Sequence, residues 1–278
     1  MNLQPWMVPG DLAPGDQKSL HRDWSGVDLC RVGSTDDPMF DLAFGALWSE
    51  FGFIGEIEQA PVLGMRMTWD PSQLVDGCAM RYRMMLATSG GKLAGVRDHT
   101  AIVLADEPGA VVHLSHNLVA PDWRRTGLAG WLRALPMTTA RNVLAAQNRP
   151  PDSPVTLVGE MEHPSDAASR ARLAAYEKAG YKKVDPARVG YLQPDFRAHH
   201  EIDISGGPQP IPLALIIRRV GREDEDFVTG AEVRRLAASL YKMYGAGFRP
   251  RDMEVVHASI EAYPPPDERI RLIPPSAP

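Results

Sequence analysis

The chain has few cysteines, no long apolar run and no excess of basic residues, and each shortage excludes a class of protein. Cys30 and Cys78 are the only two cysteines among 278 residues, too few for a disulfide framework and compatible with a reducing cytoplasm. No stretch approaches the roughly 20 apolar residues of a membrane-spanning helix. The net charge of -5 offers no general attraction to nucleic acid or to an anionic membrane. We therefore expect a cytoplasmic protein without nucleic-acid or membrane partners, and a homodimer is compatible with this composition.

Several signature motifs are also missing. The sequence contains no HExxH or CxxC grouping, so no metal is expected. It has neither the GxxxxGK(S/T) phosphate loop nor the GxGxxG fingerprint, which argues against nucleoside triphosphates and NAD as ligands. Ser115 and Ser205 do not lie in a Gly-x-Ser-x-Gly elbow, which argues against a serine hydrolase.

The N-terminal part of the chain is irregular in pattern. Residues 1–26 are rich in proline, glycine and aspartate and predict an arm without regular structure. They lack a basic segment followed by an apolar run, so they do not resemble a signal peptide. A strand is predicted at 27–32, followed by a helix up to about residue 51. Glycine and proline interrupt residues 51–77, where loops and a short helix near 71–75 are expected.

The centre of the chain has a clearer pattern. Three apolar runs are separated by two turn clusters, at 80–88, 92–105 and 110–120 for the runs and at 89–91 and 106–109 for the turns. This spacing predicts an antiparallel meander. After Pro121 the period becomes helical up to about residue 147. Pro136 falls inside that helix, and because an interior proline costs about 3 kcal/mol we expect a kink or a break there.

Further elements follow in alternation. Strands are predicted at 155–159, 181–184, 189–193 and 211–220, and helices at 166–179, 231–244 and 251–263. The chain is therefore expected to be of the α/β class with a mixed sheet, an α+β arrangement in its details. We divide it into an irregular arm at 1–26, a domain at 27–220, and a C-terminal helical extension with a proline-rich tail at 221–278.

The most informative segment is 118–130, a strand that ends in a turn and opens a helix. Unpaired backbone N–H groups and the positive end of the helix dipole meet at such a helix start. Arg124 and Arg125 add positive charge, and the small residues Gly127, Ala129 and Gly130 leave room for a phosphate near the backbone. The alternative is that these small residues only permit close packing between the helix and a strand.

At this segment the sequence resembles the GNAT acetyltransferase superfamily. Arg124-Arg125-Thr126-Gly127-Leu128-Ala129 is similar to the coenzyme motif Arg/Gln-x-x-Gly-x-Gly/Ala of that family, and residues 119–123 are similar to its lead-in. A second match, at 175–181, resembles the Tyr-x-x-x-Gly-Phe/Tyr signature. The resemblance covers roughly 27–220 and implies a mixed sheet splayed between its fourth and fifth strands.

The resemblance also implies a ligand and its contacts. Acetyl-CoA would be the co-substrate, with its pantetheine arm in the gap of the sheet. The residues implied to bind it are Leu118 and Val119 through their backbone, and Arg124, Arg125, Thr126, Gly127, Leu128, Ala129 and Gly130 around the pyrophosphate. Tyr176 is the implied acid that protonates the leaving thiol. The alternative for Tyr176 is a tyrosine at the edge of the core beside Leu173.

An amine must lose a proton before it attacks a thioester, so a base is expected. Glu160 and Glu162 follow the strand at 155–159 and share one of its faces, and Glu160 is the first choice. His116 and Glu162 are the other candidates, and His113 and His163 could line the same opening. Alternatively, the carboxylates pair with Arg170 or Arg172 or cap the next helix.

These features predict an N-acetyltransferase. It would move an acetyl or other short acyl group from CoA to a primary amine of a small molecule, peptide or protein, by direct attack in a ternary complex. The alternative is a catalytically silent CoA-binding module of the same fold. The acceptor is expected to be selected by residues 51–79 and 221–263, whose sequence does not reveal it.

Overall fold

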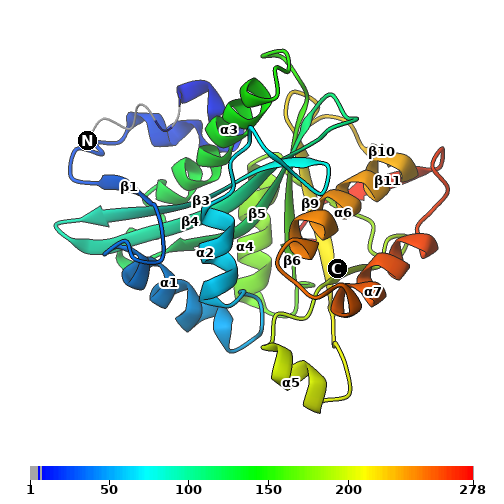
Figure 1. Ribbon diagram of the computed structural model, residues 1–278. Coiled ribbons are helices and arrows are strands. Elements are labelled where there is room, and N and C mark those ends of the chain that lie inside the picture. The colour runs from blue at the N-terminus through cyan, green and yellow to red at the C-terminus, as the bar shows by residue number, and fades with distance from the viewer. Residues whose placement is uncertain (1–5, 7, 278) are drawn as a thin grey trace.

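A long mixed sheet crosses the molecule, with helices on both of its faces (Figure 1). The computed structural model describes residue 6 and residues 8–277. The strands are β1 Asp28–Val32, β2 Leu74–Val75, β3 Cys78–Ser89, β4 Lys92–Leu104, β5 Ala110–Val119, β6 Val155–Met161, β7 Lys182–Val184, β8 Tyr191–Gln193, β9 Ile211–Arg219, β10 Phe227–Thr229 and β11 Arg269–Ile273. Their order is β1-β3-β4-β5-β6-β9-β7-β11-β10, and β2 pairs with β3 and β8 with β9.

The predicted meander forms from β3, β4 and β5. β3 and β4 pair antiparallel from Cys78 opposite Leu104 to Ser89 opposite Lys92. Gly90 and Gly91 make the turn between them with φ of 55° and 75°, a region that glycine enters without strain. β5 then pairs antiparallel with β4 along its whole length apart from one irregularity.

The sheet opens between β5 and β6, the fourth and fifth strands in spatial order. These two strands pair in parallel only from Ala110 opposite Val155 to His113 opposite Val158. Beyond that point β5 stays on β4, and β6 stays on β9 as far as Met161. A bulge in β5, opposite His99, accompanies the divergence, because a bulge bends its strand and increases its twist. The predicted mixed α/β sheet with a splayed centre is therefore confirmed.

Helices cover both faces of this sheet. One face packs against α3 Leu128–Ala146 and α4 Ala167–Lys178. The other packs against α1 Phe40–Leu47, α2 Ala60–Met67, α6 Gly230–Gly245 and α7 Pro250–Ser259. α3 continues through Pro136 without a break, because its apolar side chains, Leu132 and Leu144 among them, are buried on both sides of the proline.

The N-terminal arm packs along α3. Two 3₁₀ helices, η1 Pro9–Asp11 and η2 Pro14–His21, run beside it. Asp16 pairs with Arg133 of α3 at 2.6 Å, and Asp11 pairs with Arg141 at 2.7 Å. The arm is thus fixed by charged contacts to the helix that opens at residue 128. The part of the expected arm at residues 1–5 and 7 lies outside the described residues.

Other local elements differ from the sequence expectations. The helix predicted near 71–75 is absent; α2 forms earlier, and Leu74 and Val75 pair with β3 instead. The first predicted helix ends as a π-helical turn, η3 Trp48–Gly52. The C-terminal tail contains β10 and β11, and β11 joins the sheet through β7 because Ile270 and Leu272 alternate with exposed arginines.

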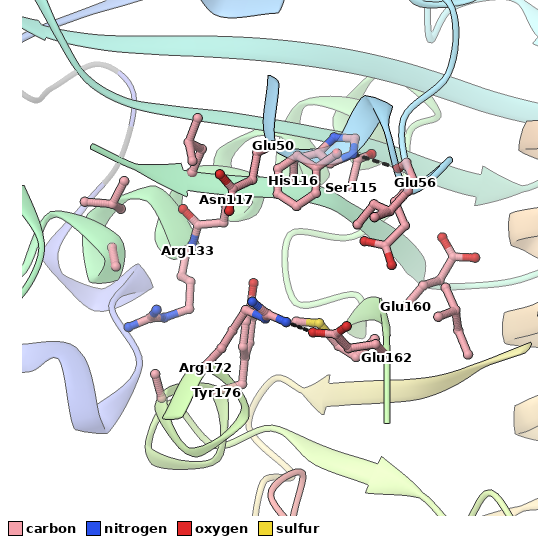
Figure 2. A pocket seen from close by; sticks show the side chains of 18 of the residues that line it. Glu50, Glu56, Ser115, His116, Asn117, Arg133, Glu160, Glu162, Arg172 and Tyr176 are labelled. Atoms are coloured by element: carbon pink, nitrogen blue, oxygen red, sulfur yellow. Dashed lines mark hydrogen bonds and ion pairs between the residues drawn. The ribbon is translucent and has the colours of Figure 1, made fainter. Parts of the chain in front are cut away.

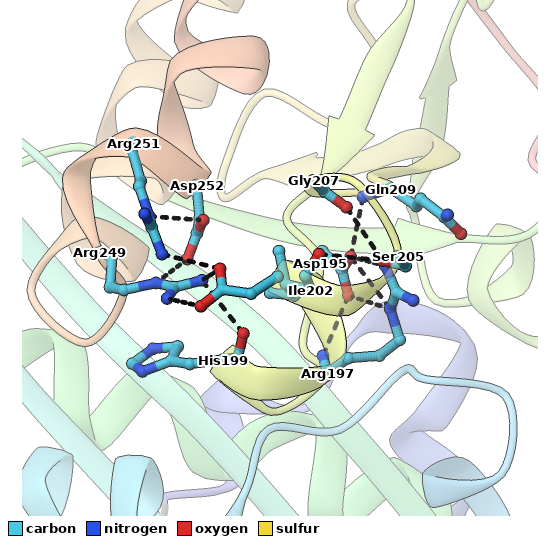
Figure 3. Close-up of polar contacts among 11 residues, drawn as sticks. Asp195, Arg197, His199, Ile202, Ser205, Gly207, Gln209, Arg249, Arg251 and Asp252 are labelled. Carbon is cyan, nitrogen blue, oxygen red and sulfur yellow. Dashed lines mark hydrogen bonds and ion pairs between the residues drawn. The ribbon is translucent and has the colours of Figure 1, made fainter.

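A short helix that was not expected, α5 His199–Ile204, lies beside the start of α7 (Figure 3). Asp203 on α5 pairs with Arg249 at 3.0 Å and with Arg251 at 2.7 Å. At the other end of the segment, Asp195 accepts hydrogen bonds from Arg197 and from the Gln209 amide. The Asp203 pairs therefore hold α5 against the start of α7, and the Asp195 contacts join the two ends of the segment 195–209. Within the described residues, no helix combines the length and apolarity needed to cross a membrane.

Candidate active site

A cavity of about 840 Å³ occupies the opening between β5 and β6. Its walls come from residues 50–58, β5, the turn before α3, β6, α4 and the C-terminal part of the chain. Figure 2 shows labelled side chains of residues 50–58, β5, α3, β6 and α4 around one space. The described residues contain no group of three or more His, Cys, Asp or Glu side chains that could hold a metal ion.

One end of the cavity is the turn before α3. Arg124, Arg125 and Ala129 line it. Alternate amides of the turn are used internally: those of Arg124, Thr126, Leu128 and Gly130 donate to Pro121 O, Trp123 O, Thr126 Oγ1 and Gly127 O. The amides of Arg125, Gly127 and Ala129 have no acceptor among the described residues. Three of the seven amides from Arg124 to Gly130 are therefore available to an anion.

The two glycines of this turn face the N-terminal arm. Gly127 has φ of 98°, and a Cβ on it would lie 2.7 Å from Ser19 Oγ. A Cβ on Gly130 would lie 2.9 Å from the Asp16 side chain. Ser19 Oγ also donates to Gly127 O at 3.1 Å. Gly127 and Gly130 thus permit close packing, as in the alternative interpretation, but they pack against the arm and not against a strand. Ala129 is the small residue on the cavity side.

Tyr176 lies on α4 at the cavity wall and is 7% exposed. Its ring packs edge-on against Tyr181 with centroids 5.1 Å apart. The Arg133 guanidinium lies 5.7 Å from the centre of the Tyr176 ring. Tyr176 therefore has both features considered from the sequence, since it borders the core and reaches the cavity (Figure 2).

The opposite end holds a chain of hydrogen bonds. Ser115 Oγ lies 3.2 Å from His113 Nδ1, and His113 Nε2 lies 2.6 Å from Glu160 Oε2. The Tyr244 hydroxyl donates to the same carboxylate oxygen at 2.5 Å. A carboxylate oxygen only accepts, so His113 donates from Nε2 to Glu160, and its Nδ1 faces the Ser115 hydroxyl. Glu160, the first-choice base, therefore has a hydrogen-bond partner, His113, on the neighbouring strand β5.

Glu160 is a charged carboxylate in a buried place. Its side chain is 6% exposed. Burial acts to raise its pKa, but the contacts with His113 and Tyr244 outweigh burial and hold the pKa below its usual value. The second oxygen, Oε1, is buried without a hydrogen-bond partner, on a residue that lines the cavity.

His116 is engaged on both ring nitrogens. Nδ1 lies 2.9 Å from Asp98 Oδ1, and Nε2 lies 3.0 Å from the Glu56 carbonyl. Although burial lowers the pKa of His116, Asp98 raises it to about 9. Both nitrogens therefore donate, and an imidazolium has no lone pair with which to accept a proton. His116 therefore holds the Glu56 backbone against β5 through this hydrogen bond.

Glu162 pairs with Arg172 of α4, and both side chains are substantially exposed. This is one of the pairings considered from the sequence. His163 is exposed and does not line the cavity, whereas His113 does. Arg170 is exposed as well.

Several lining residues were not singled out from the sequence. Glu56 comes from a segment without regular structure, and Tyr244 comes from α6, more than 80 residues after Glu160. Asn117 lies on β5, and its Oδ1 is buried without a partner. Strand periodicity could have drawn attention to Ser115 and Asn117, two and four residues after His113. No local pattern marks Glu56 or Tyr244.

No protein-family model and no curated protein matches the chain. Among solved structures, a GNAT-family acetyltransferase from Bacteroides thetaiotaomicron is similar at 15% identity over 69% of this chain and 86% of its own, with a TM-score of 0.42. An aminoglycoside acetyltransferase from an uncultured soil metagenomic sample is similar at 12% identity over 56% and 88%, with a TM-score of 0.38.

Arabidopsis thaliana Naa50, in complex with the bisubstrate analogue CoA-Ac-MVNAL, is similar at 11% identity over 69% of this chain and 98% of its own, with a TM-score of 0.40. Similarity this low carries no argument about the chain, so the reaction is argued from the residues of the site. The mixed sheet that opens between its fourth and fifth strands is the arrangement that the resemblance implied.

Proposed function

We propose that the protein is an N-acyltransferase that moves an acetyl or other short acyl group from CoA to a primary amine. The supporting observation is the position of the cavity, which lies where β5 and β6 separate after His113 and Val158. A strand edge without a neighbour presents backbone N–H and C=O groups to a ligand. The pantetheine arm of CoA contains two amides and can pair with such an edge.

The residues present fit the coenzyme. At the turn, the unused amides of Arg125, Gly127 and Ala129 and the side chain of Arg124 suit a pyrophosphate. Leu118 and Val119 line the opening and would hold the pantetheine arm through their backbone. Thr126 Oγ1 donates to Trp123 O, so it shapes the turn. The remaining positions of the proposed set, Leu128 and Gly130, begin the helix.

The coenzyme supplies an acyl group activated as a thioester, and the chain supplies position and proton transfer. Holding an amine and a thioester in the right orientation contributes up to about 7 to 11 kcal/mol to lowering a barrier. In our proposal Ser115 accepts a proton from the amine and passes its own to His113, whose imidazolium is stabilised by Glu160. Glu162 pairs with Arg172 and both nitrogens of His116 donate, whereas Glu160 is linked to the cavity through His113 and Ser115, which supports Glu160 over them.

Tyr176 is the proposed acid for the leaving thiolate. It reaches the cavity from α4, on the side of the opening away from Ser115 and His116 (Figure 2). A thiol with a pKa near 8.5 needs only weak acid help. The amine would attack the acyl carbon directly while both substrates are bound, so no acyl-enzyme is required.

Two measurements test the proposal in sequence. Acetyl-CoA at about 100 times its Kd should stabilise the fold by about 2.7 kcal/mol, which a rise in Tm reports. A panel of primary amines is then screened by release of free CoA, with wild type and with Tyr176→Phe. Loss of the hydroxyl should lower kcat by roughly 100-fold while the CoA affinity stays the same.

The outcomes separate the two hypotheses. If no Tm shift occurs, the coenzyme assignment is wrong. If CoA binds and no amine in the panel ever releases thiol, the protein is a CoA-binding module without transferase activity. If amines release thiol equally well in wild type and Tyr176→Phe, Tyr176 belongs to the core only.

A further inference from the structure

One wall of the cavity comes from residues 50–58, a segment with no part in the hydrogen-bond chain of Glu160. Glu50, Phe51, Ile54, Glu56 and Glu58 of this segment line the space. The segment is tied to β5 by the bond from His116 to the Glu56 carbonyl and to β8 by the bond from Gln193 to Gly55 O. It is therefore a fixed wall opposite α4 and not a free loop.

The carboxylates around the cavity differ in whether a positively charged side chain pairs with them. Glu58 Oε1 lies 2.5 Å from Arg66 Nη1 in a buried pair, and Glu162 pairs with Arg172. The Glu56 carboxylate is half-buried and forms no hydrogen bond or ion pair with the described residues. Glu160 Oε1 has no partner within hydrogen-bond distance, although the Tyr191 hydroxyl beside this carboxylate also lowers its pKa. Figure 2 shows Glu56 and Glu160 on the same side of the cavity.

These two carboxylates create a place for a cation. Burial raises the pKa of Glu56, and the charge of Glu160 adds to that effect, while the charges of Arg172 and His116 oppose it. A carboxylate in this situation is stabilised when a positive group binds beside it. The primary ammonium of an acceptor provides that group and three N–H donors.

Apolar side chains adjoin the same place. Phe51 and Ile54 lie on the wall beside Glu56, and Phe196 and Leu213 line the space as well. Apolar side chains that line a cavity suit the apolar part of a ligand.

We infer that the acceptor is a primary amine with an apolar group next to its nitrogen and no carboxylate, and that Glu56 binds its ammonium. This inference rests on the proposed function and names its substrate class. Amines with a carboxylate beside the nitrogen bring a negative charge close to Glu56 and Glu160, and the repulsion between like charges opposes their binding. Amines with a polar group in place of the apolar one lose the contact with Phe51 and Ile54.

Three amines test the substrate class with the full-length protein and saturating acetyl-CoA. They are 2-phenylethylamine, L-phenylalanine, which adds a carboxylate, and ethanolamine, which replaces the ring by a hydroxyl. The kcat/KM for 2-phenylethylamine should exceed both others by about tenfold or more. Equal values, or a preference for L-phenylalanine, would overturn the inference.

Glu56→Gln tests the residue. It should raise KM for 2-phenylethylamine by about tenfold with little change in kcat, and Glu56→Asp should recover part of the loss. Glu254→Gln is the matched control, because Glu254 is exposed on α7 and carries the same charge. If both substitutions raise KM equally, only the net charge matters and Glu56 is not the binding residue.

A binding measurement separates this inference from the proposed function. Calorimetry of 2-phenylethylamine is run on protein saturated with CoA, where no acyl group is present and no turnover occurs. If CoA itself does not bind, the proposed function fails. If CoA binds and 2-phenylethylamine binds wild type and Glu56→Gln equally, the inference fails and the proposed function stands. If Glu56→Gln does not fold, the ratio between 2-phenylethylamine and L-phenylalanine in wild type decides.

Discussion

The two ends of the cavity are built in opposite ways. The end at the turn before α3 comes from one continuous segment and carries the positive side chains Arg124 and Arg125. The other end combines residues 50–58, β5, β6 and α6, and its charged groups are mainly the carboxylates Glu50, Glu56 and Glu160. In the proposed reaction the first end meets a polyanion and the second a cation, so each end has the charge opposite to its ligand.

The two ends also differ in how they are held in place. At the turn, the N-terminal arm packs against Gly127 and Gly130. The Ser19 hydroxyl donates to Gly127 O, and the Arg22 guanidinium donates to Thr126 O. At the other end, buried pairs within the sheet fix the wall, chiefly His116 with Asp98 and His113 with Glu160. Changes at one end should therefore leave the function of the other intact.

The largest effect is expected from Glu160→Gln. The substitution keeps the shape and removes the charge that stabilises His113 as an imidazolium, so kcat should fall by about 100-fold to 10,000-fold. The Kd for CoA should stay unchanged, because Glu160 lies away from the turn. Both are measured by thiol release and by calorimetry. Glu162→Gln is the comparison and should lower kcat by less than about tenfold, since Glu162 already pairs with Arg172. Similar losses of kcat in the two variants would mean that Glu160 does not stabilise His113 during the reaction.

The same difference between the ends explains what the sequence could reveal. Orphan amides, charge and small residues at a helix start occur within 118–130, so a local motif was enough to find that end. Even there, the direction in which Gly127 and Gly130 face depended on the arm, more than 100 residues earlier. At the other end, the sequence placed Glu160 just after a strand, and the structure includes it in β6, but its partner Tyr244 and the wall residue Glu56 meet it only through tertiary packing. His116 was a reasonable base by residue type, and only its contacts with Asp98 and Glu56 O show that it is protonated.

A second prediction concerns stability and pH. The pKa of His116 in the folded protein is about 9, above the value near 6.5 of an unfolded chain. Its contribution is therefore fully present below about pH 6.5 and is lost as the pH rises through about 9. The free energy of unfolding, from urea titrations, should fall by on the order of 3 kcal/mol over this window. His116→Gln should lose this pH dependence. An unchanged slope would mean that His116 is not protonated.

The third prediction addresses the coenzyme end. Arg124→Gln removes a charged donor from the turn, so the Kd for CoA should rise by about tenfold while KM for the amine changes little. The dependence of CoA binding on salt should also weaken. Arg170→Gln is the control, because Arg170 is exposed on α4 outside the cavity lining. Equal effects of both substitutions would point to general attraction by surface charge and not to contact at the turn.

The smallest effect is expected where the arm meets the turn. Gly127→Ala places a Cβ at φ of 98° and 2.7 Å from Ser19 Oγ, whereas Gly221→Ala has φ of 80° and open space around the new atom. Left-handed backbone costs each alanine about 1 to 2 kcal/mol, so the excess loss of stability in Gly127→Ala measures the contact with the arm. Thermal unfolding reports both variants. In a Ser19→Ala background that excess should shrink, and CoA affinity lost in Gly127→Ala should partly return. If the two alanine variants unfold at the same temperature, the arm does not hold the turn, and the separation between the two ends needs another cause.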